Sequence, residues 1–166
     1  IKDSFDPSLL AQVVAAKRAS LFIQMIGDAK EVKMTQRGFL PKKIVTPLKQ
    51  ICIKGDELYA FPVVSEQNEL DILTLRHMIA SCGWTKIRNG RISLTRIGKY
   101  IYQHGFGSKE YVALLRQWMA HFDWARLDNY GHGGLGILQA SVVFSLYCMH
   151  MFEKESFTTQ EMARIL

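Results

Sequence analysis

The feature that most constrains the fold is a short β-hairpin with a helix on either side. Residues 84–94 alternate apolar and polar side chains around Asn89-Gly90, and both positions of such a turn need the positive φ that Asn and Gly supply. Residues 70–82 before it carry apolar side chains at helical spacing. Thr95 after it can cap a further helix. We therefore expect a helix, a hairpin and a second helix in direct succession.

A Thr-x-x-Gly tetrapeptide follows this hairpin at Thr95–Gly98 and also occurs earlier, at Thr35–Gly38. A Thr that closes a strand can accept a backbone N–H of the next turn. The Gly three residues later lets the new helix lie close against the strand. The pattern predicts a strand-to-helix junction at both places, and two copies are too few to indicate a solenoid.

Helical spacing accounts for most of the remaining chain. On the helix after the hairpin, we expect Ile97, Tyr100 and Ile101 to face inward. Residues 54–67 predict a loop with a short strand at 58–61. The expected helices are 7–26, 41–48, 70–82, 95–103, 108–122, 136–152 and a last one that begins near Thr158.

Composition indicates a globular chain, since 48% of the 166 residues are apolar and 22% are charged. Cys52, Cys82 and Cys148 form no C-x-x-C pair, which favours reduced thiols and a cytoplasmic protein. The apolar run 137–152 is shorter than the roughly 20 residues of a membrane span, so we interpret it as a buried helix. The chain begins at Ile1 and shows no signal peptide. We expect it to be a fragment of a longer protein.

The segment Trp84-x-x-Ile-x-Asn-Gly-x-Ile-x-Leu-Thr95-x-x-Gly98 resembles the wing and following helix of winged helix-turn-helix modules. In that fold three helices pack on a small hairpin, and the helix before the hairpin often enters a DNA major groove. The resemblance implies a mainly α fold with a small β-hairpin. It would comprise an N-terminal helix over 1–30, a winged-helix-like unit over 31–105 and a helical extension over 106–166.

A second resemblance covers about residues 30 to 150. It is carried by Lys33-Met-Thr-Gln-Arg-Gly-Phe-Leu-Pro-Lys-Lys-Ile-Val, the Thr95 junction and His121-Phe-Asp-Trp-Ala-Arg-Leu-Asp. This order is similar to a helical module of uncharacterised bacterial proteins, some of them plasmid-associated. The resemblance implies no activity and no catalytic residues.

Basic residues around the hairpin are the strongest functional lead, in a chain of net charge +6. Lys86, Arg88 and Arg91 flank the turn, and Arg96 and Lys99 follow on the next helix. A hairpin turn with three cations can contact DNA phosphates or enter a minor groove. It is also what a solvated hairpin often looks like. A second basic group consists of Arg37, Lys42 and Lys43.

The helix before the hairpin gives a mixed signal for DNA recognition. Arg76 and His77 would lie nearest the bases. Against this, Glu66, Glu69 and Asp71 stand at its start, where carboxylates suit the helix dipole and repel phosphates. Base-reading helices usually carry more Arg, Lys, Asn or Gln.

Patterns that suggest other chemistry have simpler explanations. The spacing of Gly131-His-Gly-Gly-Leu-Gly136 fits a dinucleotide fingerprint, but a helix rather than a strand precedes it, which favours a flexible loop. The five histidines show no metal-ligand spacing. Asp123 and Asp128 fit a helix end better than an acid pair. We infer no enzyme, cofactor, metal, membrane or small-molecule substrate.

The sequence therefore predicts a non-enzymatic winged-helix-type module, with DNA as its partner through the basic hairpin. The alternative is a protein-interaction or oligomerisation module. In that case exposed aromatic side chains would dock a partner or a second copy, the candidates being Trp118, Phe122, Trp124 and Tyr130.

Overall fold

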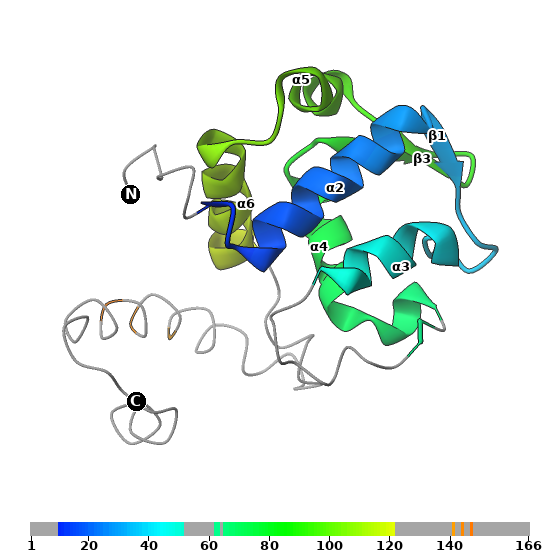
Figure 1. Ribbon diagram of the computed structural model, residues 1–166, viewed down its shortest axis with the longest axis horizontal. Coiled ribbons are helices and arrows are strands. Elements are labelled where there is room, and N and C mark those ends of the chain that lie inside the picture. The colour runs from blue at the N-terminus through cyan, green and yellow to red at the C-terminus, as the bar shows by residue number, and fades with distance from the viewer. Residues whose placement is uncertain are drawn as a thin grey trace. The chain divides into compact units, whose positions relative to one another are not determined.

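The computed structural model describes residues 10–51, 62–63 and 65–121, together with residues 141, 144 and 147 (Figure 1). The chain divides into two units, Ile1–Gln117 and Trp118–Leu166. Several predictions lie outside the described residues: the helix start near residue 7, the strand at 58–61, Cys52 and Cys148, the acids Asp123 and Asp128, the aromatic residues from Phe122 to Tyr130, the loop at 131–136, the helix at 136–152 and the helix from Thr158.

The first unit is mainly helical with one three-stranded antiparallel sheet, as the sequence predicted in outline. The hairpin and the helices on either side of it fall within a few residues of their expected places. The elements in chain order are α2 (Val14–Asp28), β1 (Glu31–Lys33), α3 (Lys42–Gln50), the 3₁₀ turn η2 (Glu66–Asn68), α4 (Leu70–Ser81), β2 (Thr85–Arg88), β3 (Arg91–Leu94), α5 (Arg96–His104) and α6 (Ser108–His121).

The sheet has the strand order β1-β3-β2. The turn between β2 and β3 is formed as predicted, with φ values of 51° at Asn89 and 68° at Gly90. β1 pairs antiparallel with β3, and Val32 stands opposite Ile92. The backbone N–H of Met34 donates to the Gly90 carbonyl at 2.9 Å. β1 is therefore the third strand of the sheet, it ends beside the hairpin turn, and it directly precedes the Thr35–Gly38 pattern that predicted a strand before it.

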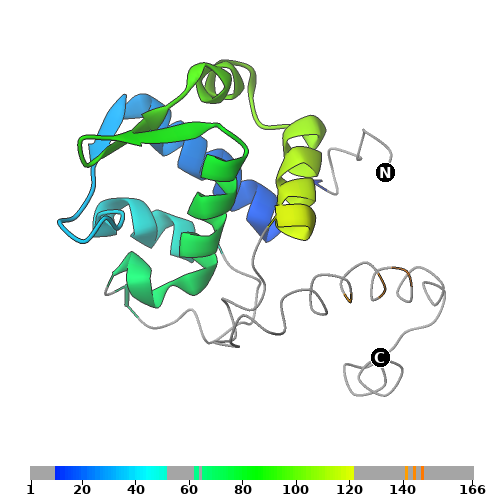
Figure 2. The same ribbon diagram turned by 180° about the vertical axis from the view of Figure 1, so that it is seen from behind.

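Helix α2 forms the centre of the first unit. Its buried side chains include Phe22, Ile23 and Ile26, and it packs on β1, β3, α3, α4 and α5. In Figure 2, α4 and the hairpin lie in front of α2. The sequence predicted a helix over 7–26, whereas α2 begins at Val14, after the non-helical residues 11–13, and continues past Ile26 to Asp28. Packing requires glycine at position 27, because a Cβ there would lie 2.3 Å from a ring carbon of Tyr102.

The junction at Thr95–Gly98 has the predicted structure. The Thr95 hydroxyl accepts from the Gly98 N–H at 3.1 Å and donates to the Gly83 carbonyl at 2.7 Å. A Cβ on Gly98 would lie 2.0 Å from the carbonyl oxygen of Trp84. Thr95 therefore caps α5, and only glycine lets this helix start so close to the hairpin.

The earlier copy at Thr35–Gly38 lies between β1 and α3, as predicted, but it forms a tight turn, and the predicted close approach of a helix at its glycine is wrong. The Phe39 N–H donates to the Thr35 hydroxyl at 3.0 Å, and the Gly38 N–H donates to the Thr35 carbonyl at 2.9 Å. Gly38 has a φ of 78° with open space around it. Helix α3 starts only after Pro41. In this copy, glycine allows a positive φ at position 38. In the copy at Thr95–Gly98, glycine allows α5 to lie close to the Trp84 carbonyl.

The buried side of α5 also differs from the prediction. Gly98 and Ile101 face inward, whereas Ile97 is 53% exposed and Tyr100 is 59% exposed. Contact of Gly98 with the Trp84 carbonyl fixes the rotation of the helix. Positions 98 and 101 share one side of a helix, so this rotation turns Ile97 and Tyr100 outward.

Candidate nucleic-acid interface

The outer face of the sheet gathers cations from all three strands. Residues paired directly across neighbouring strands share a face, and Arg91 is paired with both Lys33 and Arg88. Lys86 lies on the same face, in the next row, opposite Ser93. We call Lys33, Arg91 and Arg88 the basic row, and the basic row with Lys86 the basic face.

The opposite face of the sheet packs inward at Val32 and Ile92, which are buried, whereas Ile87, paired with Ile92 on the same face, is exposed. Lys33 was not among the predicted site residues, because only the pairing of β1 with β3 brings it beside the hairpin. In the sequence, Lys33 stands between the apolar residues Val32 and Met34. This alternation is typical of a short strand with one buried face.

The basic row holds like charges close together. Neighbouring strands lie about 4.8 Å apart, which places three cations within roughly 10 Å across the sheet. Like charges directly opposite one another destabilise a sheet. An ion pair with Glu31 of β1 offsets this repulsion at Arg91, and both of these side chains are half exposed. Lys33, Lys86 and Arg88 are exposed and form no ion pair within the part of the chain that the structure describes.

Arg76 does not reach the surface of α4, so the prediction that it lies nearest the bases is wrong. It is 7% exposed, and its Nε donates to Oε1 of Glu66 at 2.6 Å. Glu66 is fully buried and also accepts from the Leu40 N–H at 2.7 Å. Arg76 shares the inner side of α4 with the buried Ile72 and Ile79, which explains its position.

The carboxylates at the start of α4 are all paired with cations. Oε1 of Glu69 lies 2.8 Å from Nζ of Lys49, and both side chains are 10% exposed. Asp71 pairs with Arg18 of α2. We call the pairs Glu66–Arg76, Glu69–Lys49 and Asp71–Arg18 the ion-pair cluster.

The ion-pair cluster connects α4 to α2 and to the end of α3, because Arg18 also donates from Nε to the carbonyls of Leu48 and Ile51, at 3.0 and 2.8 Å. The expected repulsion of phosphates by these carboxylates is also weakened, because each negative charge has a positive partner.

The solvent side of α4 is almost neutral. His77, Ala80 and Ser81 are exposed, and Leu70 is 44% exposed. Arg76 is the only residue of Leu70–Ser81 that is Arg, Lys, Asn or Gln, and it is buried. The helix therefore offers none of the long donor side chains that form paired hydrogen bonds with guanine or adenine.

The other predicted site residues, Arg96 and Lys99, lie on α5 and are exposed. They follow the end of β3, whereas the basic row stands at its start. The strand spans about 10 Å from Arg91 to Leu94 at roughly 3.4 Å per residue. The structure therefore separates the predicted cations into the basic face and the start of α5. Arg37, Lys42 and Lys43 are also exposed, before and at the start of α3.

The thiol of Cys82 is unsuited to nucleophilic chemistry. It follows the last residue of α4 and is half-buried, and burial raises its pKa to about 11. At neutral pH it is therefore protonated. Among the residues that the structure describes, no group of His, Cys, Asp and Glu could hold a metal ion.

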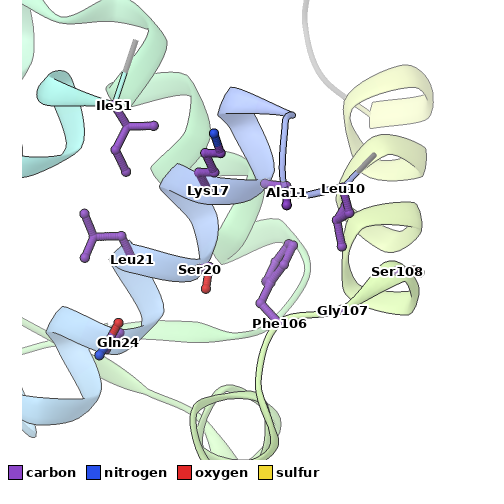
Figure 3. Close-up of a pocket in the computed structure, with 11 residues that line it drawn as sticks. Leu10, Ala11, Lys17, Ser20, Leu21, Gln24, Ile51, Phe106, Gly107 and Ser108 are labelled. Carbon is purple, nitrogen blue, oxygen red and sulfur yellow. The ribbon is translucent and has the colours of Figure 1, made fainter. Parts of the chain in front are cut away.

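A hollow of about 610 Å³ lies beside α2 (Figure 3). Its described walls are mostly apolar and include Leu21, Ile51 and Phe106, and Lys17 is the charged residue among them. No described carboxylate lines the hollow that could act with Lys17 as an acid–base pair. We therefore assign it no chemistry.

Comparison of the chain with protein families, curated proteins and solved structures finds no match. None of the helices over the described residues is long and apolar enough to cross a membrane.

Proposed function

We propose that the first unit is a winged-helix-type module that binds double-stranded DNA through its hairpin rather than through α4. The order of elements supports the fold: α2, β1, α3, α4, β2 and β3 succeed one another, and the strand order is β1-β3-β2. One departure is the long connection between α3 and α4, residues 51–69, where helix-turn-helix modules use a turn of about 3–4 residues.

The observation that carries the binding proposal is the basic row. Its cations stand opposite one another on an exposed sheet face, an arrangement that destabilises the free protein. A polyanion removes this repulsion and releases its own counterions on binding. Duplex DNA presents phosphates at a density that suits such a row.

The proposed binding mode has little sequence specificity. Phosphate contacts fix the position of a protein on a duplex but carry no sequence information directly. The exposed part of α4 offers only small or neutral groups and the imidazole of His77. We therefore expect affinity to depend strongly on salt and weakly on base sequence.

The test is the anisotropy of a labelled duplex with the double variant Lys33→Gln/Arg88→Gln, measured over a range of salt concentrations. The variant should bind about tenfold or more weakly at low salt, and the slope of log K against log salt should fall by about 1.8, or 0.9 per lost phosphate contact. Lys17→Gln/Lys109→Gln is the matched control, because it removes two exposed cations outside the basic face. Equal losses in the two double variants would overturn the proposal.

A second candidate is a protein-interaction module. It is favoured by exposed apolar side chains at Ile87, Ile97 and Tyr100, which are 53%, 53% and 59% exposed. Light scattering that finds a stable dimer without DNA binding would support it over the first proposal. Trp118, the described member of the predicted aromatic set, is half-buried.

A further inference from the structure

We propose that the outer face of α5 is a second nucleic-acid site. Unpaired bases of a strand that continues from the duplex would stack on its rings. This inference rests on the proposed function, because the basic face would hold that duplex. It adds a preference for a junction between double and single strands.

The exposed face of α5 carries two stripes. Ile97, Tyr100 and His104 follow one another at helical spacing, and Arg96, Lys99 and Gln103 form the stripe beside them. All six side chains are exposed. Rings beside cations are the combination that binds single strands, because bases stack on rings while phosphates contact cations.

The two rings are already arranged as a stack. The centroids of Tyr100 and His104 lie 4.1 Å apart with an interplanar angle of 21°. Nδ1 of His104 lies 2.9 Å from the Tyr100 carbonyl oxygen, within hydrogen-bond distance, which orients the imidazole. Tyr100 remains 59% exposed, so most of its surface is accessible to a further ring.

Contacts with the rest of the first unit fix α5 near both of its ends. Thr95 caps the start of α5 and Gly98 lies against the Trp84 carbonyl. Near the other end, the ring of Tyr102 lies over Gly27 and its hydroxyl donates to Asp28 at 2.6 Å. A rigid surface loses little conformational entropy on binding.

Charge and size favour a nucleic acid over a protein or a membrane. Arg96 and Lys99 have no carboxylate partner within the described part of the chain, so the face attracts an anion. A stable protein interface covers about 800 Å² on each partner, far more than the two large apolar side chains Ile97 and Tyr100 provide. A single base stacked on an aromatic ring, by contrast, is worth about 1–3 kcal/mol.

The position of α5 suits a strand that leaves the basic face. The length of β3 between them is about 10 Å, and three nucleotides span it even at the short duplex rise of roughly 3.4 Å each. An overhang of about six nucleotides would therefore be enough to cover the rings.

The experiment compares three labelled probes at one salt concentration: a blunt duplex, and the same duplex with a six-nucleotide overhang of either polarity. The wild-type protein should bind one overhang about 5- to 150-fold more tightly than the blunt duplex, the ratio that corresponds to about 1–3 kcal/mol for one stacked base. Tyr100→Ala should abolish this preference, Tyr100→Phe should keep it, and both should bind the blunt duplex like the wild type. Ile87→Ala is the control for an exposed apolar side chain outside α5, and it should keep the preference.

Equal affinity of the wild type for all three probes, or a preference that survives in Tyr100→Ala, would overturn the inference and leave the proposed function intact. Lys33→Gln/Arg88→Gln should weaken all probes while keeping their ratio. Failure of the wild type to bind any probe would overturn both proposals. Thermal unfolding checks that the Tyr100 variants are folded, as expected for an exposed side chain.

Discussion

The basic face and the ion-pair cluster use charge in opposite ways within one unit. On the sheet, cations stand side by side in solvent, and among the described residues only Arg91 of these cations has a carboxylate partner. At the start of α4, every carboxylate has a cation and most of these groups are buried. The cluster stabilises the arrangement of the helices, whereas the basic face remains available for a ligand. The same residue types therefore serve the fold in one place and, in our proposal, binding in the other.

The largest effect is expected from breaking the ion-pair cluster on one side. Arg76→Met leaves Glu66 buried without its cation, which should lower the free energy of unfolding by about 3–5 kcal/mol. The double variant Glu66→Gln/Arg76→Met should recover much of this loss, because it removes both charges while an amide oxygen can still accept from the Leu40 N–H. Urea unfolding measures the two values. A fully stable Arg76→Met with weaker DNA binding would show instead that Arg76 acts at the interface.

The two Thr-x-x-Gly copies allow a smaller, matched comparison. Gly98→Ala forces a Cβ to 2.0 Å from the Trp84 carbonyl oxygen, and we expect a loss of about 1–3 kcal/mol or more, as for other overpacked sites. Gly38→Ala meets no neighbouring atom, so its loss should be limited to about 1–2 kcal/mol for the left-handed backbone. Thermal unfolding of both variants tests the assignment. A reversed order would contradict the close approach at Gly98.

The inner side of the sheet offers a stabilising change. Thr85 is 6% exposed, and within the described residues its hydroxyl has no hydrogen-bond partner. Thr85→Val replaces this hydroxyl with a methyl group of similar size, and it should raise the free energy of unfolding by about 1 kcal/mol. DNA affinity should stay unchanged, because the side chain faces away from the basic face. A loss of stability would indicate that the hydroxyl is paired.

Local features of this fold were predictable from the sequence, and long-range ones were not. The Asn89-Gly90 turn and the Thr95 cap depend on neighbouring residues, and both are present. The basic row depends on pairing between β1 and β3, whose ion-paired residues Glu31 and Arg91 are 60 positions apart. No local pattern indicates that register.

The misassigned side chains have the same cause. Arginine is usually a surface residue. Arg76 is buried because it forms an ion pair with Glu66, ten residues earlier. Ile97 and Tyr100 fit an inward stripe as well as Ile101 does, until contact of Gly98 with Trp84 sets the rotation of α5. Sequence periodicity gives the existence of a helix more reliably than the direction of its faces.

In our proposal, the basic row destabilises the free protein and binds DNA. Thermal unfolding and duplex binding of Lys33→Gln/Arg88→Gln, measured together, test it most directly. We predict a gain of about 0.2–1 kcal/mol in the free energy of unfolding at low salt, from relieved cross-strand repulsion, with a gain that shrinks as salt screens the charges, alongside the loss of duplex affinity. A variant that loses stability, or that gains it while binding DNA like the wild type, would contradict the claim.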